Sequence, residues 1–186
     1  MKRITAYVLA LVLACSCAVS MAGAYTDVPG GSALAGEVEK AVSYGLMNGY
    51  SQDRFGCSDA MTRAQFVVVL TRMMGWQTPS DEETAASITA AMALPKNLSS
   101  QYRSAIACAA AHDVIGQSEA FHPNSPATRA EMAEMLVRAL GLKSCAADAE
   151  KENSLPFTDV SDKKGYIAVA YEIGMTKGLT DTTFAP

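Results

Sequence analysis

Apolar residues recur at helical spacing in two stretches of the chain, residues 61–75 and 127–141. In both stretches they lie three or four positions apart, which is the period of one face of an α-helix. Each stretch opens on a threonine that is followed three residues later by Gln or Glu, and each ends on a glycine. These are the usual signals for the start and the end of a helix. The pattern therefore predicts two amphipathic helices of about four turns.

The two predicted helices are copies of one segment, MTRAQFVVVLTRMMG and ATRAEMAEMLVRALG, spaced 66 residues apart. The matching capping pairs are Thr62 with Gln65 and Thr128 with Glu131. An arginine follows the threonine in each copy, at Arg63 and Arg129. A cation there is unfavourable beside the positive end of the helix dipole. Its recurrence therefore suggests another role, such as contact with an anion next to the first-turn N–H groups.

The repetition extends beyond these helices. A Thr-Asp-Val opening occurs at residues 26–28 and again at 158–160, two periods later, and each is followed by a shorter helical stretch, a polar turn and a phenylalanine. A fixed period of this length indicates stacked units that bury their apolar faces against one another. The predicted layout is a signal peptide at 1–24, a first repeat at 25–75, an inserted connector at 76–98, a second repeat at 99–142, a linker at 143–155 and a partial third repeat at 156–186.

The first 24 residues have the pattern of a secretory signal peptide. Two basic residues precede an apolar run and then small residues, and cleavage is expected before Tyr25. A competing interpretation is lipoprotein processing, with Cys15 or Cys17 lipidated. Both interpretations place the protein outside the cytoplasm. The apolar run is short for a membrane span, and we expect no transmembrane helix once the signal is removed.

Composition narrows the classes of ligand and reaction. Two of the 15 Lys and Arg residues fall in the predicted signal peptide. After its removal the chain has 13 basic and 19 acidic residues, so the formal charge changes from −4 to −6. That balance argues against nucleic acid as a partner, and any anion must be held by a few placed arginines. Cys57, Cys108 and Cys145 remain, and their pairing cannot be read from the sequence. Because no catalytic, metal-binding or cofactor motif stands out, we expect no enzyme, no metal and no cofactor.

In their order and spacing these motifs resemble S-layer homology repeats, whose unit reads roughly F-x-D-V, a short helix to G-I, G-Y-x-D-G-T-F, then P-I-T-R-A-E-F and a longer helix. HPNSPATRAEMAEMLVRALG is a close match, YGLMNGYSQDRF with MTRAQF is a fair one, and FTDV with GLTDTTFAP matches the front half. The resemblance implies a mainly α fold. Units of short helix, turn and long helix would pack around a central helix bundle, with the third long helix missing.

The resemblance also implies a function, namely non-covalent attachment to the bacterial cell wall. Such repeats bind a secondary cell-wall polysaccharide, often anionic and pyruvylated, in the grooves between repeats, and the protein would lie at the cell surface. Two residues depart from the motif, since Gln65 replaces a glutamate and Gln52 an aspartate. The residues carried over as glycan contacts are Arg63, Arg129, Thr62, Thr128, Glu131, Gln65, Gln52 and Asp181.

An alternative remains open, a structural or protein-interaction module whose repeats no longer bind glycan. The opening of the middle repeat has decayed to Ala93-Leu94-Pro95, and the sequence stops at Pro186, where a third T-R-A-E helix would begin. At least one groove would then be incomplete, unless another chain completes the third repeat. Both interpretations describe a surface protein without catalytic activity.

Overall fold

A computed structural model describes residues 25–117, 120–152 and 155–186. The predicted signal peptide, with its two cysteines, lies outside the described residues. The chain divides into two compact units, with the boundary between Asp59 and Ala60. We call them unit 1 and unit 2 and describe each by itself.

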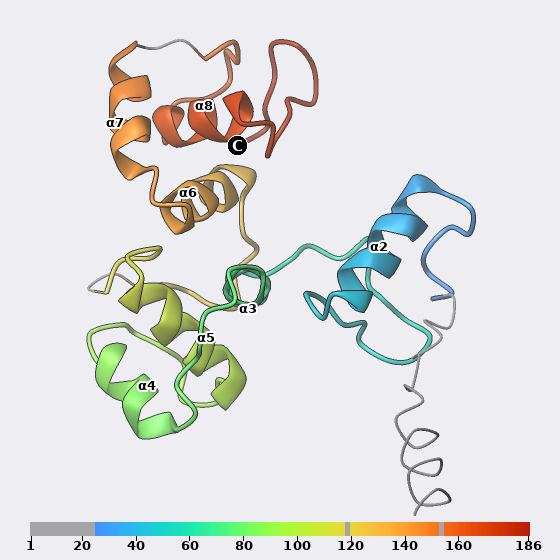
Figure 1. The fold of residues 1–186 in the computed structure, drawn as a ribbon, viewed down its shortest axis with the longest axis vertical. Coiled ribbons are helices and arrows are strands. Elements are labelled where there is room, and N and C mark those ends of the chain that lie inside the picture. Colours follow the sequence, from blue (N-terminus) through green and yellow to red (C-terminus); the bar gives the residue numbers. More distant parts are fainter. Residues whose placement is uncertain (1–24, 118–119, 153–154) are drawn as a thin grey trace, which may run out of the picture. The chain divides into compact units, whose positions relative to one another are not determined.

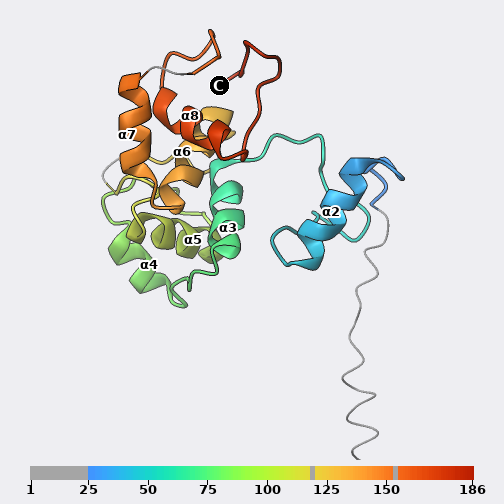
Figure 2. The ribbon, with the colours of Figure 1, turned by 45° about the horizontal axis from the view of Figure 1, so that its top comes forward.

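Helices make up the regular structure of the described residues, which contain no strand beyond an isolated antiparallel bridge between Thr62 and Pro126 (Figures 1 and 2). This arrangement confirms the expected mainly α fold. No helix in the described part of the chain combines the length and the apolar character needed to cross a membrane.

Unit 1 contains one described helix, α2 (Ala33–Ser43), together with the loops on either side of it. The hydroxyl of Ser32 caps this helix by accepting a hydrogen bond from the Ala35 backbone N–H. The carboxylate of Asp27 holds the later loop, because it accepts the backbone N–H groups of Phe55 and Gly56 at 2.8 and 2.6 Å. The aspartate of the Thr-Asp-Val opening thus fastens the phenylalanine loop.

Unit 2 contains two groups of three helices in the same order. The first group is α3 (Arg63–Met73), α4 (Glu82–Ile88) and α5 (Ser100–Ala111), and the second is α6 (Arg129–Ala139), α7 (Lys143–Glu152) and α8 (Lys164–Glu172). In each group the last helix packs against both of the others (Figure 1). The long helices α3 and α6 contact each other much less. Packing in unit 2 therefore pairs α3 with α5 and α6 with α8, rather than joining α3 and α6 in a central bundle.

The helix signals read in the sequence are confirmed in α3 and α6. The Thr62 and Thr128 hydroxyls each accept a hydrogen bond from the backbone N–H three residues later, and the Gln or Glu side chain at that position accepts the threonine's own N–H. Gly75 and Gly141 follow the ends of the two helices with φ of +65° and +73°, the left-handed conformation that favours glycine. Local sequence alone accounts for where these two helices begin and end.

Helix α6 contributes to two hydrophobic cores. Met135 belongs to the first core, which is formed mainly by α3 and α5. The second core contains residues of α7 and α8 and the fully buried ring of Phe184. The α6 residues in this second core are Ala130, Ala133 and Val137. Because both cores use α6, the residues on its remaining face are held in fixed positions.

The two segments between the predicted repeats both contain helices. The connector at 76–98 includes α4, and the segment at 143–155, which was expected to be a linker, includes α7. Helix α7 packs closely on α8 at Gly165, where a Cβ atom would lie only 1.9 Å from the carbonyl oxygen of Ala146. The periodicity of the repeats does not reveal this contact, because it depends on a glycine that leaves room for a neighbouring backbone.

The aspartate contact of unit 1 recurs in unit 2. Asp159 accepts the backbone N–H groups of Phe184 and Ala185 at 2.9 and 2.8 Å. The hydrogen bond from Phe184, and then that from Ala185, hold the pKa of the Asp159 carboxyl below its ordinary value of 3.8. Asp159 therefore anchors the loop that carries Phe184 into the second core.

We predict that Asp159→Asn destabilises unit 2 at neutral pH and that this loss shrinks in acid. Because the folded-state pKa is depressed, the unfolded chain binds the proton more readily. The stabilisation is therefore complete well above pH 3.8 and is lost as the pH falls through that value toward the folded pKa. Urea denaturation at a series of pH values would measure the difference between wild type and variant. Asp181→Asn, in the exposed turn of the same loop, is the control; a difference for Asp159→Asn that does not change with pH would contradict the prediction.

Candidate functional site

A charged stripe on α6 lines a cavity in unit 2. Glu131, Glu134 and Arg138 occur at positions i, i+3 and i+7, which places them on one face of the helix. The cavity has a volume of about 370 Å³, and its walls come from the start of α3, the loop after α5, α6 and the turn before α8. The charged and histidine side chains in its lining are Arg63, His122, Glu131, Glu134, Arg138 and Lys163. These residues belong to segments of all three predicted repeats.

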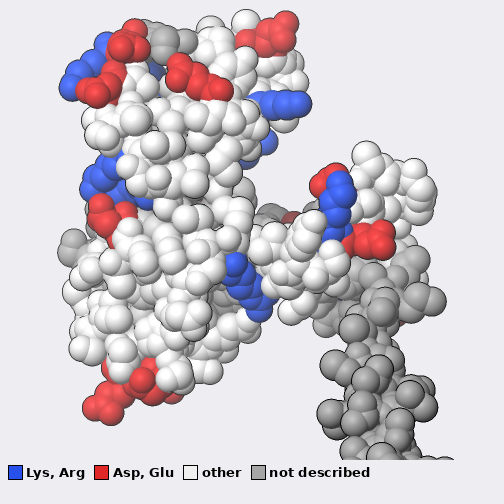
Figure 3. Space-filling view, in the orientation of Figure 1, with Lys and Arg blue, Asp and Glu red and all other residues white. Residues whose placement is uncertain are grey.

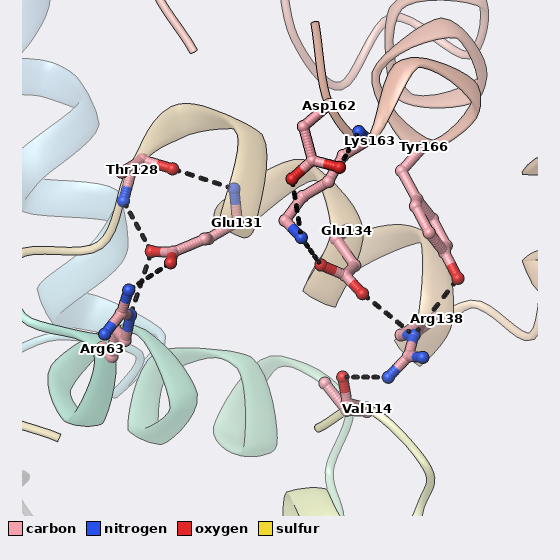
Figure 4. A network of polar contacts seen from close by, with 9 residues as sticks. All are labelled: Arg63, Val114, Thr128, Glu131, Glu134, Arg138, Asp162, Lys163 and Tyr166. Atoms are coloured by element: carbon pink, nitrogen blue, oxygen red, sulfur yellow. Dashed lines mark hydrogen bonds and ion pairs between the residues drawn. The ribbon is translucent and has the colours of Figure 1, made fainter. Parts of the chain in front are cut away.

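Arg63, the first residue of α3, forms a two-point ion pair with Glu131 (Figure 4). Its Nε donates to Oε2 at 3.0 Å and its Nη2 donates to Oε1. The backbone N–H of Thr128 also donates to Oε2, at 3.0 Å. Burial is the largest single influence on the pKa of the Glu131 carboxyl and raises it. The hydrogen bonds from Arg63 and Thr128, with the charges of Arg63 and Lys163, together outweigh burial, so the pKa lies below its ordinary value. The carboxylate is therefore charged at neutral pH and balances the charge of Arg63.

The first turn of α3 has its backbone N–H groups occupied. Arg63 and Ala64 donate to the carbonyl oxygens of Ser125 and Pro123 at 2.9 and 3.0 Å, and Thr62 accepts the next two N–H groups. The expectation that this helix start and its arginine converge on a ligand anion therefore does not hold for α3. The reason is tertiary: the segment before α6 crosses the start of α3, and its carbonyl oxygens accept the hydrogen bonds that an anion would accept.

Arg129, at the same place in the second copy, is bound differently. Its Nε donates to the carbonyl oxygen of Phe184 at 3.0 Å and its Nη2 to that of Lys177 at 2.5 Å. The guanidinium lies over the Phe184 ring, 4.6 Å from its centroid. Within the described part of the chain no acidic side chain forms an ion pair with Arg129. Its charge is matched by carbonyl dipoles and an aromatic face only, so it can still attract an anion.

A second group of charges surrounds Glu134 (Figure 4). Its Oε2 accepts from Lys163 Nζ at 3.0 Å, and its Oε1 lies 3.4 Å from Arg138 Nε. Arg138 also reaches the hydroxyl of Tyr166 at 3.3 Å and the carbonyl oxygen of Val114 at 3.4 Å. These contacts link α6 to α8 and to the loop after α5.

The structure brings together only part of the predicted site. Thr62 and Gln65 form the capping box of α3, Gln52 is exposed in unit 1, and Asp181 is exposed in the turn after α8. None of these four lines the cavity. The predicted residues that are joined across the two copies are Arg63, Thr128 and Glu131.

Three charged residues of the cavity were absent from the predicted set: Glu134, Arg138 and Lys163. Helical spacing could have identified the first two, because they share a face of α6 with Glu131. Lys163 lies in a turn outside the copied segment, so no repeated pattern indicates it.

Charges on unit 2 occur in small groups. On the face seen in Figure 3, most of the surface of unit 2 is uncharged, and the charged side chains form small separate groups, some of one sign and some mixed. No group of three His, Cys, Asp or Glu side chains among the described residues could hold a metal ion. Cys57, Cys108 and Cys145 are free thiols. The cavity is thus a polar site with nearly balanced charge.

Comparison with known proteins agrees with the motifs. The model of the S-layer homology domain matches residues 24–67. A "Cell surface protein" of Thermoanaerobacter kivui is 28% identical over 161 residues, which are 83% of this chain and 18% of that protein. The "S-layer protein EA1" of Bacillus anthracis is 32% identical over 127 residues, 67% of this chain and 14% of that protein. The chain thus spans less than a fifth of the length of these relatives.

The domain match covers the front half of the first copied segment, and the two similarities extend over most of the chain. They agree with the capped Thr-Arg-Ala helices and with the aspartate openings that fasten the phenylalanine loops. The chain is therefore an S-layer homology domain protein.

Proposed function

We propose that this chain attaches a bacterial protein to the cell wall without a covalent bond, by binding a secondary cell-wall polysaccharide. Two relatives are named "Cell surface protein" and "S-layer protein EA1", and the matching family is the S-layer homology domain. By this proposal the protein works outside the cytoplasm, at the cell surface. Its role is binding and involves no catalysis.

The observation that carries the proposal is the polar cavity in unit 2. Five charged side chains line its volume of about 370 Å³, which is in the usual range for small-ligand sites. Paired planar guanidinium and carboxylate groups can donate to and accept from neighbouring hydroxyl groups of a sugar. A site of this size accommodates one or two sugar units of a longer chain.

The charges of the site favour an anionic polymer, such as one that carries pyruvyl groups. The cavity has three cations and two carboxylates in its lining, and a third carboxylate, that of Asp162, pairs with Lys163 beside it. Arg129 adds a cation that is not ion-paired within the described residues. The whole chain is negative, at −4, so attraction to an anion must come from these local groups.

One observation favours the alternative of a structural module that does not bind glycan. Both repeated arginines are engaged within the protein, Arg63 by Glu131 and Arg129 by two carbonyl oxygens. Their recurrence could then serve to join successive repeats. Wall binding by variants of the two arginines distinguishes the two functions.

We predict that Arg129→Ala weakens wall binding about 10- to 100-fold, the range for one charge-assisted hydrogen bond of about 1.5–3 kcal/mol. Arg129→Lys should restore only part of the affinity, because lysine lacks the planar fork. Co-sedimentation with purified cell walls, before and after extraction of their secondary polymer, measures the effect. Lys151→Ala removes the same charge from an exposed position and is the control. Full wall binding by an Arg63→Ala, Arg129→Ala double variant would refute a role of the two repeated arginines in glycan binding and would leave them a structural role.

A further inference from the structure

The three cations of the cavity differ in how firmly the protein holds them. Arg63 has two nitrogens on one carboxylate, including a bond of 3.0 Å. Lys163 lies between two carboxylates, with Nζ 3.0 Å from Glu134 and 3.3 Å from Asp162. Both charges are thus balanced by close partners of opposite sign.

Arg138 is held much less firmly. Its contacts to Glu134, Tyr166 and Val114 measure 3.4, 3.3 and 3.4 Å, whereas hydrogen bonds from nitrogen to oxygen are shortest and strongest near 2.9 Å. Its Nη2 makes no hydrogen bond to the part of the chain that the structure describes. Glu134, its only ion-pair partner there, is shared with Lys163 at a shorter distance. Asp113, whose charge also acts on Arg138, is paired with Lys143 at 2.8 Å. Arg138 is therefore the cation of the cavity with the longest contacts to its partners.

The position of Arg138 keeps its guanidinium at the cavity. The residue is on α6, which both cores hold in place, and its side chain is only 18% exposed. Its guanidinium carbon lies 5.8 Å from the centroid of the Tyr166 ring. Figure 4 shows the two arginines in separate groups, Arg63 with Glu131 and Thr128, and Arg138 with Glu134, Tyr166 and Val114. A ligand can therefore engage Arg138 without breaking the ion pair of Arg63.

We propose that Arg138 contacts an oxyanion of the wall polymer in this cavity and so determines which polymers bind. This inference rests on the proposed function and names the specificity residue of that site. In the motif, the arginine after the capping threonine would make this contact. In this chain that arginine is Arg63, and Glu131 balances its charge. Arg138 lies two turns further along α6 than Glu131 and lines the same cavity, and its charge is less closely balanced than that of Arg63. The oxyanion is a carboxylate or a phosphate on a sugar, since a guanidinium fork binds either.

The test is a cycle of protein variants and polymer treatments. The secondary polymer is released from purified walls and titrated into the full chain by calorimetry in three forms: native, mildly acid-treated to remove ketal-linked carboxylates, and treated with hydrofluoric acid to remove phosphates. Arg138→Gln should bind the native polymer about tenfold more weakly than wild type does. For one of the two treated polymers, Arg138→Gln and wild type should have equal affinity. The group that this treatment removes is the oxyanion that Arg138 contacts. Arg138→Lys should lie between wild type and Arg138→Gln.

Tyr166→Phe separates ligand contact from a structural role. It removes a hydroxyl contact of Arg138 but leaves the guanidinium, so binding should stay within about twofold of wild type. Circular dichroism and thermal melting of each variant confirm the fold, and Arg138→Lys provides the comparison if Arg138→Gln does not fold. If Arg138→Gln weakens native and treated polymers equally, or if Tyr166→Phe reproduces its effect, the inference is overturned.

The outcomes also separate this inference from the proposed function. If Arg129→Ala weakens binding but Arg138→Gln does not, wall binding stands and Arg138 is not the specificity residue. If wild type itself does not bind the native polymer, the proposed function fails and the inference fails with it.

Discussion

Replacing Phe184 with alanine should destabilise unit 2 by about 3–5 kcal/mol, the usual cost of removing a buried phenylalanine from a core. The Phe184 side chain is 0% exposed and belongs to the core shared by α6, α7 and α8. Its ring lies 5.4 Å from that of Phe157 and beneath the guanidinium of Arg129. Urea denaturation of the full chain, followed by circular dichroism, would measure the loss.

Leu179→Ala is the matched control, because Leu179 precedes Phe184 in the same loop and is 65% exposed. We expect that change to stay within about 0.5 kcal/mol of wild type. A loss of less than about 1 kcal/mol for Phe184→Ala would contradict its place in the core. Wall binding should weaken together with stability in this variant, since the Phe184 ring lies against the guanidinium of Arg129.

Replacing Gly165 with alanine should also be costly, at about 1–3 kcal/mol or more. The new Cβ would lie 1.9 Å from the carbonyl oxygen of Ala146 and 2.9 Å from the backbone nitrogen of Glu150. Both obstacles are backbone atoms of α7, so rotation of a side chain cannot relieve the clash. Helix α7 would have to move away from α8 and open the second core.

The sign of this effect is informative, because glycine to alanine inside a helix otherwise stabilises a protein by about 0.5–1 kcal/mol. Gly36→Ala in α2 tests that baseline, since a Cβ there meets nothing within 4 Å. Thermal melts should show a lower midpoint for Gly165→Ala and an unchanged or higher one for Gly36→Ala. Equal effects of the two changes would show that α7 does not pack on α8 at Gly165.

The two copies of the Thr-Arg-Ala segment show how far a repeated motif determines a site. Each copy forms the same capped helix, yet Arg63 binds a carboxylate 68 residues away and Arg129 binds carbonyl oxygens 55 and 48 residues away. An arginine side chain is long enough to contact whatever the fold brings near the helix start. The shared local motif therefore forms the same secondary structure in two different charge environments.

The charged stripe of α6 was partly readable in advance. The spacing of Glu131, Glu134 and Arg138 places them on one helix face by geometry alone. How closely each of them is paired depends on Lys163 and Val114, in a turn and a loop that helical periodicity does not describe. The candidate specificity residue therefore emerges only from the distances in the folded chain.

Much of this protein could be predicted from the sequence by itself. The mainly α fold, the capping boxes at Thr62 and Thr128, the left-handed glycines that end α3 and α6, and the membership in the S-layer homology family all follow from residues close together in the chain. These features depend on hydrogen bonds over three or four residues and on helical periodicity. Such interactions are complete within a short segment, so the segment alone specifies them.

Only the tertiary structure decided how those segments meet. It paired α3 with α5 and α6 with α8, and it packed α7 on α8 where Gly165 leaves room for the Ala146 carbonyl. It occupied the first turn of α3 with carbonyl oxygens from the loop before α6. It also formed the cavity and left Arg138 as its least balanced cation. These outcomes depend on close approaches between segments far apart in the chain, where a difference of about 1 Å separates a hydrogen bond from no contact, and no local pattern encodes such distances.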